Sequence, residues 1–120
     1  MPEDSQGRAR VRLLEDYCDN SFIPPTTMLL TQLRKTDAER DGQRVEQARE
    51  ELRRGLYLLR DQLGSQEYLV GREFTLADAS FAPRIMVLGR LGIEFEPALS
   101  TVQAWVDRIR TRPSVRGLGL

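Results

Sequence analysis

Hydrophobic residues recur every three or four positions through most of the chain, which is the spacing of one face of an α-helix. The clearest case is the segment 45–63, where charged residues fill the other face and the regularly spaced apolar residues are Val45, Ala48, Leu52, Leu56, Leu59 and Leu63. Gly64 follows at the position where a left-handed C-cap is expected. The pattern predicts an amphipathic helix that ends at residue 63.

The first part of the chain shows a similar pattern that is interrupted by two prolines. Between residues 8 and 33 the apolar positions include Leu14, Tyr17, Cys18 and Phe22. Pro24 and Pro25 follow; each lacks a backbone N–H, and its ring collides with the carbonyl four residues back. We therefore expect a helix that bends or breaks here and resumes through 28–33. The polar stretch 35–43 then reads as an exposed connection.

Two more helices are predicted in the second half of the chain. Residues 76–91 are apolar almost all round, which is typical of a helix surrounded by others. We expect Pro83 to bend this helix and Gly92 to end it. Apolar residues at helical spacing return between 99 and 109, before a stop at Pro113. Together the segments predict an all-α fold.

Composition narrows the class of protein. The 120 residues suffice for one domain with a single core. Basic and acidic side chains balance at 18 each, so charge gives no indication of nucleic-acid binding. No apolar stretch is long enough to span a bilayer, and the N-terminus has no apolar signal-peptide core. We expect a cytoplasmic protein without a membrane partner.

The chain offers few residues for catalysis. It contains no histidine and one cysteine, which excludes histidine triads and a cysteine-built zinc site. Cys18 is a nucleophile only if its pKa is lowered, and Asp16 and Asp19 would raise it, so we favour a buried, inert thiol. Glu15 with the same two aspartates suggests either a metal site or a solvated helix face, and we favour the latter.

A group of arginines is a further candidate, for binding an anion. The group comprises Arg49, Arg53, Arg54 and Arg60. Three glutamates are interleaved with it, at positions Glu46, Glu50 and Glu51. Because the opposite charges neutralise each other, the sequence does not favour an anion site. We therefore expect no catalytic residue and no metal site in this chain.

The stretch GREFTLAD, residues 71–78, combines a threonine and an aspartate three positions apart. It is either a small polar site or a helix start. The spacing is that of a capping box, in which the Thr75 hydroxyl accepts a backbone N–H and the Asp78 carboxylate reaches back to the N–H of Thr75. We favour this structural role, and expect Thr75→Ala or Asp78→Ala to lower stability by about 1 kcal/mol each.

The stretch GREFTLAD resembles the core motif of the C-terminal domain of glutathione transferases. It consists of a glycine, a polar pair, an aromatic residue and then T-L-A-D, which opens an apolar helix. RARVRLLEDYCDNSFIP resembles the long first helix of that domain, and the segment around Trp105 with RTRPSV resembles its late helix. The resemblance covers essentially the whole chain. The alternative is an unrelated helical bundle with a coincidental match.

The resemblance implies an all-helical bundle of four to six helices over residues 1–120, with 1–7 as the remainder of an interdomain linker. Members of the family carry a thioredoxin-like domain ahead of this one, which supplies the catalytic residue and most contacts to glutathione. That domain is the implied partner. Without it we expect the chain to be inactive and to hold no cofactor, and glutathione is the substrate only when the two domains are joined.

By position in the family, the first helix of this domain forms a wall of the hydrophobic-substrate pocket and part of a dimer interface. This implies a homo-oligomer, with Tyr17, Phe22, Thr26 and Thr27 as candidate ligand-facing residues. In the alternative interpretation, the two aromatic residues belong to the core and the threonines are caps. A second functional hypothesis is a stand-alone docking module of the same fold, as helical domains of this family form in translation and stress-response proteins.

Overall fold

A computed structural model describes residues 4–113 of the 120-residue chain. All regular elements in that range are helical, which confirms the all-α class and the expected number of helices. Three short turns also occur: the π-helical η1 (Cys18–Phe22) and the 3₁₀-helical η2 (Leu88–Leu91) and η3 (Pro97–Leu99). The α-helices are α1 (Ser5–Tyr17), α2 (Ile23–Leu33), α3 (Gly42–Leu63), α4 (Leu76–Met86) and α5 (Ser100–Arg110).

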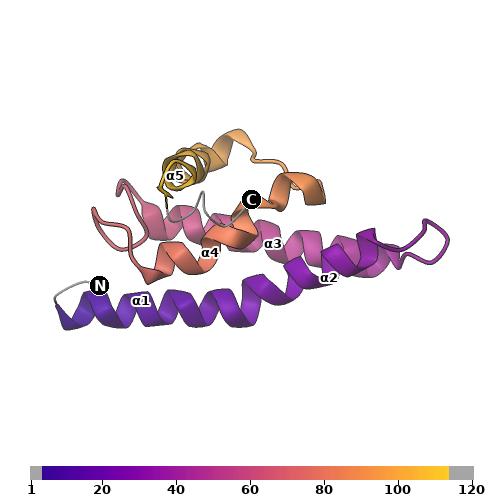
Figure 1. Ribbon diagram of the computed structural model, residues 1–120, viewed down its shortest axis with the longest axis horizontal. Coiled ribbons are helices and arrows are strands. Elements are labelled where there is room, and N and C mark those ends of the chain that lie inside the picture. Colours follow the sequence, from indigo (N-terminus) through magenta and orange to yellow (C-terminus); the bar gives the residue numbers. More distant parts are fainter. Residues whose placement is uncertain (1–3, 114–120) are drawn as a thin grey trace.

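The helices pack as an elongated bundle with extents of 51 × 26 × 25 Å. In Figure 1, α1 and α2 form one long, bent rod, and α3 returns beside it after a loop that projects at one end. α4 packs on α1, and α5 packs on both α3 and α4. The largest fully buried side chains lie where these helices meet and include Trp105, Phe22, Phe81, Leu52 and Leu56.

The bend between α1 and α2 lies just ahead of the two prolines. In η1, the N–H of Ile23 donates to the carbonyl of Cys18, five residues back instead of four. Pro24 and Pro25 then occupy the first turn of α2, directly after the π-helical turn, so their missing N–H groups fall where the regular bonding to the carbonyl four residues back is already interrupted. The expected bend is confirmed, but the chain remains helical through it (Figure 1).

Helix α1 begins inside the segment 1–7 that we expected to be the remainder of a linker. The Asp4 carboxylate caps the helix by accepting the N–H of Gly7 at 2.5 Å, and the helix begins at Ser5. Positions 5–7 are therefore helical, and 1–3 lie outside the described residues. No helix among residues 4–113 is long and apolar enough to cross a membrane.

The amphipathic helix α3 also begins earlier than its apolar pattern. The Asp41 carboxylate accepts the N–H groups of Gln43 and Arg44 at 3.1 and 3.3 Å, so the polar segment ahead of Val45 contains an N-cap. Gly64 ends the helix with a φ of 52°, a value that favours glycine. Its ψ of −121° lies outside the expected left-handed helical region.

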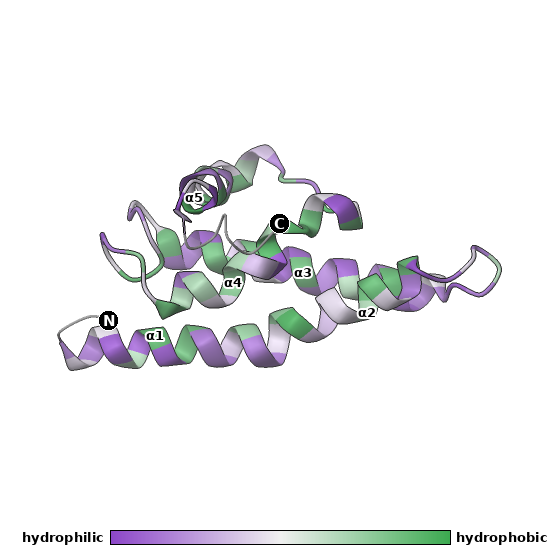
Figure 2. Ribbon diagram, viewed as in Figure 1, coloured by the Kyte–Doolittle hydropathy of each residue, from purple (hydrophilic) through white to green (hydrophobic). Residues whose placement is uncertain are grey.

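The apolar segment 76–91 differs from the expected single, enclosed helix. α4 contains Pro83 and ends at Met86. The 3₁₀-helical turn η2 follows it and ends just before Gly92, whose φ is 79°. The Leu76 side chain is 54% exposed, and several residues of α4 are only half-buried. Figure 2 shows that apolar residues are frequent along α4, whereas α1 and α3 alternate between apolar and polar residues. α4 is therefore packed on one side and open on another.

Candidate functional site

Asp78 is the most completely bonded polar side chain in the core. It is fully buried, and Thr75 at the start of α4 donates to its Oδ2 through the backbone N–H at 2.9 Å and through the hydroxyl at 3.3 Å. Its Oδ1 accepts the N–H of Leu69 at 3.0 Å and the indole Nε1–H of Trp105 at 2.8 Å. The carboxylate therefore joins the loop before α4, the start of α4 and α5.

Thr75 completes the capping box. Its hydroxyl accepts the backbone N–H of Ala77 at 3.2 Å, and the reciprocal pair with Asp78 is formed. Because a buried helix start has no water to satisfy its free N–H groups, these two side chains serve the backbone. The indole contact with Trp105 goes beyond a cap. T-x-x-D spacing predicts the cap, but no local pattern predicts a partner 27 residues away.

Two of the four candidate ligand-facing residues are buried. Phe22 packs edge-on against Phe81 of α4, with ring centroids 5.3 Å apart, and lies so close to α3 that a Cβ on Gly55 would be 2.9 Å from its ring. Thr26 is 4% exposed, and its hydroxyl donates to the Phe22 carbonyl at 2.8 Å. Neither side chain is available to a ligand in this structure. Phe22 lies in the core as the alternative interpretation expected, whereas Thr26 bonds to the carbonyl four residues earlier and is not a helix cap.

The other two candidates reach the surface at separate places. Tyr17 is half-buried and lines an open groove of about 330 Å³ between the end of α1 and α3, together with Ser21, Glu51 and Arg54. Burial raises the pKa of its hydroxyl. Thr27 is exposed on α2. The structure therefore does not bring the four side chains together into one surface.

Cys18 is fully buried, and its thiol donates to the Ser80 carbonyl of α4, with an Sγ–O distance of 3.3 Å. Burial raises the pKa of the thiol to about 11, against the opposing charge of Arg84 and with a smaller contribution from Asp19. The main cause is therefore desolvation, and Asp16 has no part in it. A protonated, enclosed thiol is a poor nucleophile at neutral pH.

The arginines of α3 differ from one another in their pairing. Arg53 and Arg54 both reach the Glu50 carboxylate, at 3.5 and 3.8 Å, and Arg60 pairs with Asp61 at 3.3 Å. Arg49 has no ion pair or hydrogen bond within the described part of the chain, and its Nε is buried. Over the same residues, no group of three or more acidic, histidine or cysteine side chains is placed to hold a metal ion.

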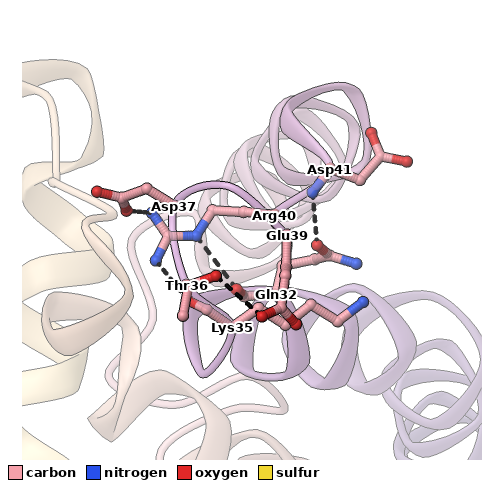
Figure 3. A network of polar contacts seen from close by, with 7 residues as sticks. All are labelled: Gln32, Lys35, Thr36, Asp37, Glu39, Arg40 and Asp41. Atoms are coloured by element: carbon pink, nitrogen blue, oxygen red, sulfur yellow. Dashed lines mark hydrogen bonds and ion pairs between the residues drawn. The ribbon is translucent and has the colours of Figure 1, made fainter.

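The connection between α2 and α3 is more ordered than its polar sequence suggests. Figure 3 shows Arg40 donating to the carbonyls of Gln32 and Lys35, at 3.1 and 3.2 Å, and to Asp37 at 3.0 Å. The buried amide of Gln32 accepts the N–H of Asp41 at 2.8 Å. The local sequence indicates this network only through Arg40, a cationic side chain that follows the C-terminus of α2.

Comparison with known families gives a clear match. Residues 22–113 match the family model described as "Glutathione S-transferase, C-terminal domain". The chain is 27% identical over 121 residues to glutathione S-transferase F14 of Arabidopsis thaliana, an alignment that covers 95% of this chain and 48% of that protein. The chain thus spans about half the length of this curated relative.

Solved structures agree with the family match. A theta class glutathione S-transferase from Xanthomonas axonopodis pv. citri superimposes with a TM-score of 0.82 at 28% identity, over 96% of this chain and 62% of that one. Ure2p in complex with S-hexylglutathione gives a TM-score of 0.84 at 21% identity, over 97% and 56% of the two chains, and this likeness bears on the fold alone.

Proposed function

The chain belongs to the family of glutathione S-transferase C-terminal domains, and on this premise we propose that it is the helical half of a glutathione-transferase-like, cytoplasmic protein. Its role is to complete a hydrophobic-substrate pocket and a dimer interface for a thioredoxin-like domain. That domain supplies the catalytic residue and binds glutathione as a substrate. The helical chain alone has no conjugating activity.

The open side of α4 is the observation that carries this proposal. This helix is rich in apolar residues, yet the Leu76 side chain is 54% exposed and that of Leu13, on the adjoining α1, is 68% exposed. A contiguous exposed apolar patch marks an interaction surface, so we propose that these two leucines, on helices that pack together, belong to one face that another domain or chain covers. We propose a thioredoxin-like domain as this partner, because the chain spans only about half the length of its curated relative.

The residues of the chain support a binding role and give no support to a catalytic one. The Cys18 thiol is enclosed and its pKa is raised, so it is not an activated nucleophile. Of the candidate ligand-facing side chains, we retain Tyr17 and Thr27, which reach the surface. Phe22 and Thr26 act indirectly, because they stabilise the bend between α1 and α2. Tyr17 and Thr27 lie close to that bend in sequence, at the end of α1 and in α2.

The test is a conjugation assay on the purified 120-residue chain with glutathione and 1-chloro-2,4-dinitrobenzene, after removal of host transferases on immobilised glutathione. We expect the rate of the uncatalysed reaction. A rate above that background which is lost in Tyr17→Phe or Cys18→Ala would show that the chain itself is catalytic, and would refute the proposal.

A second candidate function is a stand-alone docking module, and the same two exposed leucines favour it. Here the open face binds a protein partner instead of a thioredoxin-like domain. Sedimentation velocity over a wide range of protein concentrations tests this alternative. Self-association that is lost in a Leu13→Ser/Leu76→Ser double variant supports a docking face, whereas a strict monomer at high concentration counts against it.

A further inference from the structure

A small polar cavity lies between α3 and the segment that joins α4 to α5. Its volume is about 150 Å³, and it is more enclosed than the groove beside Tyr17. None of the candidate substrate-wall residues lines it. A volume of this order suits a ligand of about the size of an amino acid, well below that of a nucleotide.

Part of the charge around the cavity is already paired. Glu96 accepts a hydrogen bond from the Tyr57 hydroxyl at 2.6 Å and lies 3.5 Å from the Arg53 guanidinium. Arg53 also contacts Glu50, which in turn pairs with Arg54. These groups form one connected network and leave no free charge for a ligand.

Three charged side chains on the cavity wall are not paired. Arg49 is half-buried and its buried Nε has no hydrogen-bond partner, whereas Glu46 and Glu94 are exposed to solvent and their carboxylates make no ion pair or hydrogen bond within residues 4–113. A guanidinium N–H without an acceptor is unfavourable where water has little access. The wall therefore has one guanidinium with an N–H that no described residue satisfies, and two solvent-exposed carboxylates that are free to pair with a ligand.

Gly92 allows the Arg49 guanidinium to lie close to the backbone of the segment between α4 and α5. A Cβ at this position would lie 3.3 Å from Nη2 of Arg49, closer than most side-chain contacts. The φ of 79° favours glycine by itself, and the missing side chain also allows the guanidinium to lie this close to the backbone. Carboxylates are the anions that guanidinium groups bind with two parallel hydrogen bonds, so a ligand in the cavity would reach Arg49 through a carboxylate.

We infer that this cavity binds a basic α-amino acid of the size of ornithine or lysine. The ligand carboxylate pairs with Arg49, and its two ammonium groups pair with Glu46 and Glu94. Such a ligand carries one negative and two positive charges, the complement of the unpaired charges on the wall. The inference concerns a site separate from the proposed substrate pocket and does not depend on it.

Other small ligands match the cavity less well. A simple anion satisfies Arg49 but adds negative charge beside Glu46 and Glu94. A divalent cation lacks a suitable ligand set, because no group of three or more metal-binding side chains occurs among residues 4–113. A neutral amino acid leaves one of the two carboxylates without a partner. The basic amino acid alone satisfies all three charges.

Isothermal titration calorimetry of the full chain with L-lysine and L-ornithine tests the inference. We expect saturable binding of one ligand per chain for at least one of the two. L-Norleucine lacks the side-chain ammonium and cadaverine lacks the carboxylate, so each should bind about tenfold more weakly or worse. L-Glutamate should bind least.

Variants assign the binding to the cavity. Arg49→Gln and Glu94→Gln should each weaken lysine binding by about tenfold or more. The matched controls are Arg44→Gln and Glu51→Gln, which alter the same residue types on α3 outside the cavity and its charge network and should leave binding within about twofold. Circular dichroism verifies that each variant is folded.

Three results would overturn the inference. The first is no binding of either amino acid at concentrations up to about 10 mM. The second is binding of the same strength in Arg49→Gln as in the parent chain. The third is equal binding of lysine, norleucine and glutamate, which would show that the charges on the wall do not select the ligand.

Discussion

Two single side chains, Asp78 and Arg40, each hold a loop against the helices, but they do so at different depths. Asp78 is fully buried and accepts four hydrogen bonds from three segments of the chain. Arg40 lies at the projecting loop, with its side chain 29% exposed, and donates to two backbone carbonyls and to Asp37. In number of bonds the two sites are similar.

The difference in burial determines what each site contributes to stability. When a buried acceptor is removed, its donors lose their partner and water cannot replace it, so the full desolvation cost remains. When an exposed donor such as Arg40 is removed, water reaches the carbonyls that it served. We therefore expect a large effect at Asp78 and a small one at Arg40.

The largest effect is expected for Asp78→Ala, which leaves the N–H groups of Leu69 and Thr75 and the indole of Trp105 without an acceptor. The free energy of unfolding should fall by about 4 kcal/mol in urea denaturation, well above the 1 kcal/mol expected of a cap alone. Asp107→Ala, at an exposed carboxylate of α5, is the control and should cost less than about 0.5 kcal/mol. Equal losses in the two variants would contradict the role of burial.

A smaller effect is expected for Trp105→Phe, which keeps an aromatic ring but removes the N–H that donates to Asp78 at 2.8 Å. The lost hydrogen bond and the small cavity should together cost about 2 kcal/mol. Circular dichroism is the suitable readout, since the substitution removes the only tryptophan. Amide exchange of Leu69 should change little, because its own bond to Asp78 remains; rapid exchange there would show that the indole holds the loop directly.

The two sites also differ in how far the sequence predicts them. T-x-x-D ahead of an apolar run predicts the Thr75/Asp78 cap, because a cap is a local contact between residues three apart. The bond to Trp105 depends on how α4 packs on α5, which no local spacing encodes. The Arg40 network was missed for a related reason: a polar loop with no apolar period resembles any solvated connection.

The helices themselves were more predictable than the surface that they form. The apolar spacing between Val45 and Leu63 identified α3, while the cap at Asp41 lay ahead of the periodic residues and was missed. The substrate-wall prediction depended on family position, and position along a helix does not tell which face is covered. Phe22 and Thr26 consequently proved to be buried at a bend whose packing only the structure shows.

Thr75→Ala tests the cap without removing the buried carboxylate. The variant loses the hydroxyl that accepts the N–H of Ala77 at 3.2 Å and donates to Asp78 at 3.3 Å, while the backbone bond from position 75 to the carboxylate is retained. The expected loss is about 1 kcal/mol by urea denaturation. Thr75→Ser keeps the hydroxyl and should recover most of that loss. A Thr75→Ala variant as unstable as Asp78→Ala would mean that the hydroxyl, and not the carboxylate, organises this junction.

The smallest effect is expected at the projecting loop. Arg40→Gln removes the donors to the carbonyls of Gln32 and Lys35 near the end of α2, together with a favourable charge at that end of the helix. Because water reaches this site, the free energy of unfolding should fall by only about 0.5 kcal/mol. Arg40→Lys keeps the charge but not the forked geometry of the guanidinium. It therefore separates the contribution of the charge from that of the hydrogen bonds to the carbonyls. The loss should be local: amide exchange of Asp41, whose N–H bonds to Gln32, should accelerate while that of Leu69 stays unchanged. A global loss close to that of Asp78→Ala would show that burial does not distinguish the two sites.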